Sequence, residues 1–82
     1  MERKERAERI RKAETIYASK LRTKLEPLYA GQYVAIDPNS EDYFLGSSLR
    51  EACLLGARKH PRQKLVCLRV GYAATRFIGS HA

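Results

Sequence analysis

The chain has no tryptophan, one methionine, three prolines and only two cysteines among its 82 residues. Cys53 and Cys67 lack the CxxC spacing that is typical of zinc sites and thiol oxidoreductases. We therefore expect buried thiols in a reducing compartment, and neither a metal nor any other cofactor. No apolar run approaches the roughly 20 residues that a bilayer span needs. Because the N-terminus also lacks the pattern of a secretory signal, the sequence predicts a cytoplasmic protein with no membrane partner.

Recognisable catalytic patterns are missing as well. Glycine-rich phosphate loops are absent, and neither His60 nor His81 has a nucleophile at a familiar spacing. Asp37, Glu41 and Asp42 surround a predicted turn. Clustered carboxylates can hold a divalent metal, but here they are more typical of a solvated polar turn. The sequence predicts a chain that is not an enzyme and has no small-molecule substrate.

Positive charge is what the chain has in excess. Sixteen lysines and arginines stand against nine acids, which gives a net charge of +7. Residues 1–26 carry nine basic and five acidic side chains, residues 27–46 carry three acids and no base, and residues 47–82 carry seven bases and one acid. A strongly basic surface favours a polyanionic or acidic partner.

Residues 2–25 are predicted to form one helix, because they contain no glycine or proline and are rich in good helix formers. Pro27 and Gly31 close the segment. We expect residues 1–24 to be a charged helix that partly protrudes. Apolar residues at steps of three and four mark one face of it: Ala7, Ile10, Ala13, Tyr17, Leu21, Leu25 and Leu28.

Residues 25–82 are predicted to form a single compact α+β domain with a small, mainly antiparallel sheet. The expected order after the first helix is β-β-α-β(-β): strands at 32–36 and 42–45, a helix from Ser48 to about Lys59, a strand at 64–70 and a short strand at 75–78. Ser48 and Glu51 fit a capping box, and Gly56 predicts a helix packed close to the sheet. The third strand should return beside the first. The second helix would cover one sheet face, and the first helix would cover the other or reach outward.

Two binding surfaces follow from these patterns. The apolar face of the first helix could pair with a protein partner or a second copy, as a dimer, or it could pack on its own sheet; its proposed interface residues are Ile10, Ala13, Tyr17 and Leu21. The basic clusters could instead contact nucleic acid, with Tyr33, Tyr43 and Tyr72 either stacking bases or packing at the core edge. The candidate contacts are Arg3, Arg6, Arg9, Lys12, Arg58, Lys59, Arg62, Arg69 and Arg76.

Several short runs carry a resemblance. The runs GQYVAID at 31–37, DYFLG at 42–46, Glu51-Ala52, His60-Pro61 and RVGY at 69–72 resemble a family of small uncharacterised bacterial α+β proteins, over about residues 25–80. The segment from Tyr43 to Ala52 is similar to the strand-to-helix junction of HicB-type antitoxins, which have a partial RNase H-like fold and neutralise a small toxin ribonuclease. This resemblance implies a regulatory or antitoxin-like protein–protein module. The alternative is a nucleic-acid-binding protein.

Overall fold

A computed structural model of the chain describes the backbone of residues 2–79 and the side chains of residues 4–72. The N-terminal helix and the β-β-α-β-β order that follows it confirm the predicted α+β class. The elements are α1 (Glu2–Ile16), a π-helical turn η1 (Tyr17–Leu21), α2 (Arg22–Tyr29), β1 (Tyr33–Ile36), β2 (Tyr43–Gly46), α3 (Leu49–Lys59), β3 (Leu65–Arg69) and β4 (Tyr72–Gly79).

The four strands form one antiparallel sheet in the order β2-β1-β3-β4. The third strand lies beside the first, as the connectivity predicted. Val34 stands opposite Leu45 on one side and Leu68 on the other. Strand β4 is longer than the short strand expected at 75–78, because it already begins at Tyr72. The tail at 80–82 lies outside the described residues.

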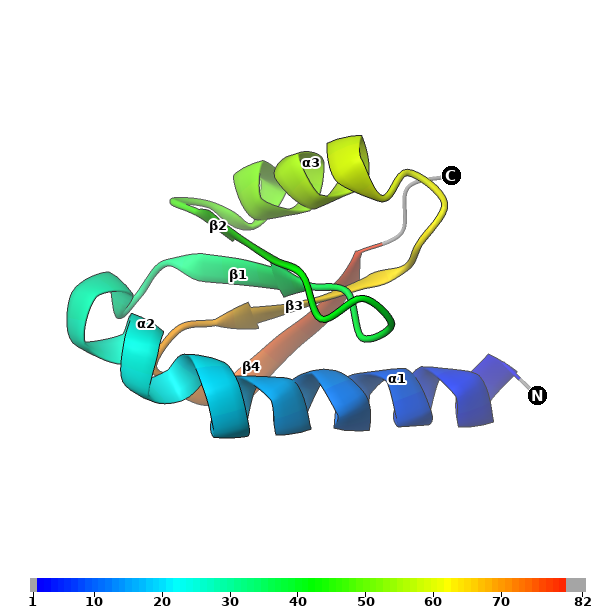
Figure 1. Ribbon diagram of the computed structural model, residues 1–82, viewed down its shortest axis with the longest axis horizontal. Coiled ribbons are helices and arrows are strands. Elements are labelled where there is room, and N and C mark those ends of the chain that lie inside the picture. Colours follow the sequence, from blue (N-terminus) through cyan, green and yellow to red (C-terminus); the bar gives the residue numbers. More distant parts are fainter. Residues whose placement is uncertain (1, 80–82) are drawn as a thin grey trace.

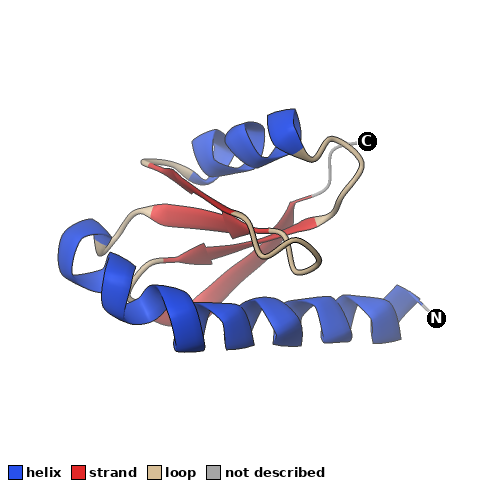
Figure 2. Ribbon diagram, viewed as in Figure 1, coloured by secondary structure: helices blue, strands red, loops and turns tan. Residues whose placement is uncertain are grey.

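Helices cover both faces of the sheet, so the molecule has three layers (Figures 1 and 2). Since side chains alternate along a strand, Val34 and Ile36 face α1 and η1, while Ala35 faces α3. The larger core lies under the N-terminal helix: Ala13, Ile16, Tyr17, Leu21, Leu25, Val34, Ile36, Val66, Leu68 and Val70. The smaller core lies under α3: Ala35, Ala52, Leu65 and Cys67, with Tyr33, Phe44, Leu49 and Cys53 packed against it.

The π-helical turn keeps the apolar face of the N-terminal helix on the sheet. Ala13, Tyr17, Leu21 and Leu25 are all buried and stand four residues apart. In a regular helix, a side chain four residues further on points about 40° beyond a full turn. Over the three steps from Ala13 to Leu25 this rotation would carry the apolar side chains away from the sheet. The wide turn from Tyr17 to Leu21 takes up this excess.

Tyr17 links this wide turn to the turn between β3 and β4. Its hydroxyl donates to Glu26 Oε2 at 2.8 Å and accepts from the backbone N–H of Gly71 at 3.1 Å. Burial raises the pKa of the Tyr17 hydroxyl, and the Glu26 carboxylate acts in the same direction, while the bond from Gly71 opposes both. Tyr17 therefore joins η1, α2 and the turn between β3 and β4.

Two expectations about the end of the first helix are wrong. The helix continues past Pro27 to Tyr29. Pro27 has no N–H to donate to the Thr23 carbonyl, and the helix extends only two residues beyond it. Leu28 does not continue the apolar face, because 75% of its surface is exposed.

The structure packs the proposed interface residues of the first helix against the chain's own sheet. Ala13, Tyr17 and Leu21 are buried against the chain's own sheet, and Ile10 packs at the margin of the same core. Of the two alternatives, packing on the chain's own sheet is the one observed. In the first turns of α1, residues 4–8 are all exposed.

Helix α3 begins and packs as the sequence predicts. Ser48 caps it, since its hydroxyl accepts from the Glu51 N–H at 3.1 Å. The Glu51 carboxylate accepts from the Ser47 N–H at 2.6 Å. In the expected capping box it would accept from the N–H of the cap residue Ser48, one position later. A side chain at Gly56 would collide with Leu65, which confirms the close approach of α3 to the sheet.

We predict that Gly46→Ala destabilises the fold by about 2 kcal/mol, because overpacking against backbone cannot relax easily. A Cβ at Gly46 would lie 2.5 Å from the backbone nitrogen of Ala52. Urea unfolding followed by circular dichroism measures the change. Arg50→Ala, on the exposed side of α3, is the control and should change stability little. Equal stability of the two variants would contradict the close approach.

Candidate nucleic-acid interface

The turn between β1 and β2 is built around a buried carboxylate. Asp37 is only 1% exposed. Its Oδ1 accepts from the Asn39 N–H at 3.0 Å, and its Oδ2 accepts from the Ser40 hydroxyl at 2.9 Å. The predicted local bonding of the turn is therefore present, but the expectation that all its acids are solvated is wrong for Asp37.

His60 connects this turn to the end of α3. Its backbone N–H donates to Gly56 O and closes the helix. Its ring lies between two carboxylates, with Nε2 at 2.8 Å from Asp42 Oδ2 and Nδ1 at 3.5 Å from Asp37 Oδ2. Phe44 packs edge-on against the ring, with centroids 6.0 Å apart. The sequence suggested only a helix-end role for His60, and no local signal pointed to either carboxylate.

The remaining carboxylates of the turn also have partners within the chain. Glu41 forms an ion pair with Lys20 of η1. The hydrogen bond from His60 lowers the pKa of Asp42 against a smaller opposing effect of desolvation, and Lys59, 3.9 Å away, lowers it further. Among the described residues no group of three side chains could hold a metal ion. The turn's acids thus fix its position against α3 and η1.

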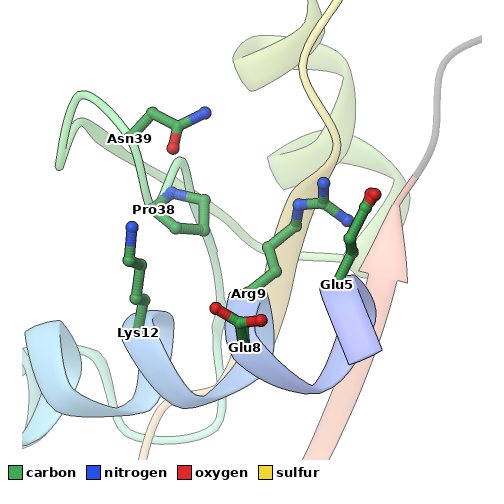
Figure 3. Close-up of a pocket in the computed structure, with 6 residues that line it drawn as sticks. All are labelled: Glu5, Glu8, Arg9, Lys12, Pro38 and Asn39. Atoms are coloured by element: carbon green, nitrogen blue, oxygen red, sulfur yellow. The ribbon is translucent and has the colours of Figure 1, made fainter. Parts of the chain in front are cut away.

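The same turn brings two basic segments together. Asn39 Nδ2 donates to Gln63 Oε1 at 3.0 Å, which places the turn beside the loop after α3. Pro38 and Asn39 also line a pocket with Arg9 and Lys12 of α1. Figure 3 shows Lys12 extending from α1 toward the turn, while Arg9 extends toward the Glu5 side of the pocket. Residues far apart in the sequence therefore meet at one end of the molecule.

We call this region the basic end and define it by five cations on the segments that meet there: Arg9, Lys12, Arg58, Arg62 and Lys64. All but the half-buried Arg9 are exposed. None of the five forms an ion pair within the described part of the chain, whereas the neighbouring Lys59 contacts Asp42. Lys64 adjoins Gln63, the residue that contacts the turn.

The other candidate contacts divide among three places. Arg6 is exposed on the first turns of α1, and the side chains of Arg3 and Arg76 lie outside the described residues. Arg69 lies at the opposite end of β1, where its Nε donates to Gly31 O at 3.2 Å and its guanidinium stacks 4.3 Å from the centre of the Tyr72 ring. Arg69 is therefore not part of the basic end.

Exposed leucines form a second surface on α3. Leu54 and Leu55 are consecutive in α3, are 40% and 39% exposed, and lie on the two flanks of the side that faces away from the sheet. Leu28 of α2 is more exposed, but it stands alone there. Adjacent apolar side chains on an outer helix face are a feature of protein contact surfaces.

Searches of protein-family models, curated proteins and solved structures found no match to this chain. In the part that the structure describes, no helix is both long and apolar enough to cross a bilayer.

We predict that Asp42→Asn removes a component of stability that depends on acid pH. The pKa of Asp42 in the folded chain lies below its ordinary value of 3.8. The carboxylate's contribution is therefore full above the unfolded pKa and is lost as the pH falls through the lower, folded pKa. Urea unfolding between about pH 2 and pH 6 should show a smaller loss of stability at acid pH for the variant than for the natural chain. Parallel pH profiles for the two proteins would exclude this role.

Proposed function

We propose that the chain is a non-enzymatic binding module that holds the phosphate backbone of a nucleic acid at its basic end. One observation carries the proposal. The acids of the turn, which would repel phosphate, are engaged within the chain by Lys20, Lys59 and His60. The five cations of the basic end have no such partner among the described residues.

Phosphate is a suitable ligand for this arrangement. Lysine and arginine side chains neutralise phosphates and release condensed counterions, which gives affinity that depends on salt and little on sequence. The cations come from α1, α3 and the loop after α3, so they can follow an extended backbone rather than enclose one small anion. Glu5 and Glu8 line the pocket beside Arg9 and Lys12, so the ligand is expected around the pocket and not inside it.

An aromatic side chain is available beside the turn. Tyr43 follows Asp42 directly, begins β2 and is 37% exposed. Exposed aromatic rings next to a basic path stack the bases of single strands. Tyr72 is more exposed but lies under Arg69 at the other end of β1. This supports a single-stranded ligand, with Tyr43 as a base-stacking platform.

We predict that Arg62→Gln combined with Lys64→Gln weakens binding of a fluorescent single-stranded oligonucleotide about tenfold, and lowers the magnitude of the slope of log affinity against log salt by about 1.4. Fluorescence anisotropy at several salt concentrations measures both effects. The matched control is Lys24→Gln with Arg50→Gln, which removes the same charge from exposed residues outside the basic end. Equal losses for the two double variants would show that only net charge matters, and would reject a defined site.

A protein partner is the second candidate function, and the exposed leucines of α3 favour it. The antitoxin-like hypothesis requires a protein contact surface, and the buried face of α1 cannot supply one. An aspartate at Ala13, Tyr17 or Leu21 would unfold the core rather than test an interface. Leu54 and Leu55 are therefore the residues to test.

We predict that the chain self-associates through α3 at high salt, and that Leu54→Asp with Leu55→Asp makes it monomeric without unfolding it. Apolar contacts persist at salt concentrations that screen charge. Sedimentation velocity at several protein concentrations measures the association. Leu28→Asp, a leucine-to-aspartate change on exposed α2, is the control. A natural chain that stays monomeric at high concentration would count against this surface as a self-association site.

A further inference from the structure

The two cysteines lie against each other between α3 and the sheet. Cys53 is on the inner side of α3 and Cys67 is in the middle of β3, and their Sγ atoms are 2.8 Å apart. The structure holds them as thiols. A disulfide bond is about 2.05 Å long, so the sulfur atoms need to approach by only about 0.8 Å to reach bonding distance.

The packing around the pair keeps the two sulfur atoms together. Gly56 allows α3 to approach β3 closely, since any side chain there would meet Leu65. Ala52 is fully buried in the same layer. Because protein interiors are close-packed, neither cysteine can move away without opening a gap. The proximity is thus a property of how α3 docks on the sheet.

The two thiols differ in their access to solvent. Cys67 is 0% exposed, whereas Cys53 is only half-buried. Cys53 is therefore the more accessible of the two residues, and we expect a small oxidant in solution to react there before it reaches Cys67. This asymmetry resembles a pair in which an accessible thiol reacts first and a neighbouring thiol resolves the product.

We propose that Cys53 and Cys67 form an intramolecular disulfide when the chain meets a peroxide. The Cys53 thiolate attacks one oxygen of hydrogen peroxide, the O–O bond breaks, and the other oxygen leaves as water after taking up a proton. Cys53 is then a sulfenic acid. Cys67 attacks its sulfur, the S–O bond breaks, and the hydroxyl leaves with the thiol proton as a second water. Both sulfur atoms are oxidised and the peroxide is reduced.

The bond would fix α3 to β3. It would close a loop between residues 14 apart in sequence, and a cross-link of this length restricts the unfolded chain more than the folded one. Oxidation is therefore expected to raise the melting temperature by roughly 5 °C or more. The proposal does not depend on which ligand the basic end holds.

The test uses the purified full chain, treated with hydrogen peroxide under native conditions and then alkylated in denaturant. We expect a monomer whose mass is lower by two hydrogen atoms, with neither cysteine alkylated and a higher melting temperature. Alkylation of both cysteines after treatment, or cross-links only between chains, would overturn the proposal.

Two single variants test the order of events. In Cys67→Ala, Cys53 should still react with peroxide, and a dimedone probe should trap its sulfenic acid. In Cys53→Ala, Cys67 should stay alkylatable in denaturant after the same treatment, because the oxidant cannot reach it in the folded chain. Melting curves before oxidation verify that both variants fold. Oxidation of Cys67 at the natural rate in Cys53→Ala would contradict Cys53 as the first site.

Discussion

The structure depends on covering both faces of a very small sheet. Strand β1 has apolar side chains on each side, with Val34 and Ile36 toward the first helix and Ala35 toward α3. A domain of this size buries only about 60% of its unfolded surface, so neither face can be left open. The chain has one helix for each face, and the apolar side of the N-terminal helix is consequently committed to the interior.

This constraint decides where binding surfaces can lie. Once the inner sides of α1 and α3 are used for the core, only helix ends, outer helix faces and loops remain available. The three-layer arrangement places the start of α1, the turn after β1 and the end of α3 toward the same end of the molecule (Figure 1). The contacts of Asn39 and His60 then join the turn to the end of α3 and the loop after it, so the cations of these segments lie at the same end of the molecule.

Local sequence signals predicted most of the fold. Ser48 marked the start of α3, Gly56 marked its close approach, and alternation in the strands gave both buried faces. The predictions that failed depend on contacts between residues far apart in the sequence. Periodicity identified the apolar face of the first helix, but it could not say whether Ala13 and Tyr17 meet the same chain or another. Likewise, turn chemistry predicted the bond between Asp37 and Asn39, whereas the contact of Asp37 with His60 joins residues 23 positions apart.

The sequence predicted only part of the candidate site. Its cations are not equally strong evidence for an anionic ligand. Arg58 and Lys59 occupy the last turn of α3, where positive charge stabilises the negative end of the helix dipole. Lys59 also contacts Asp42. These two residues therefore have structural reasons to be basic. Arg62 and Lys64 lie beyond the helix, are exposed and have no ion-pair partner among residues 4–72. Because folding gives these two charges no role, they are the stronger argument for an anionic partner.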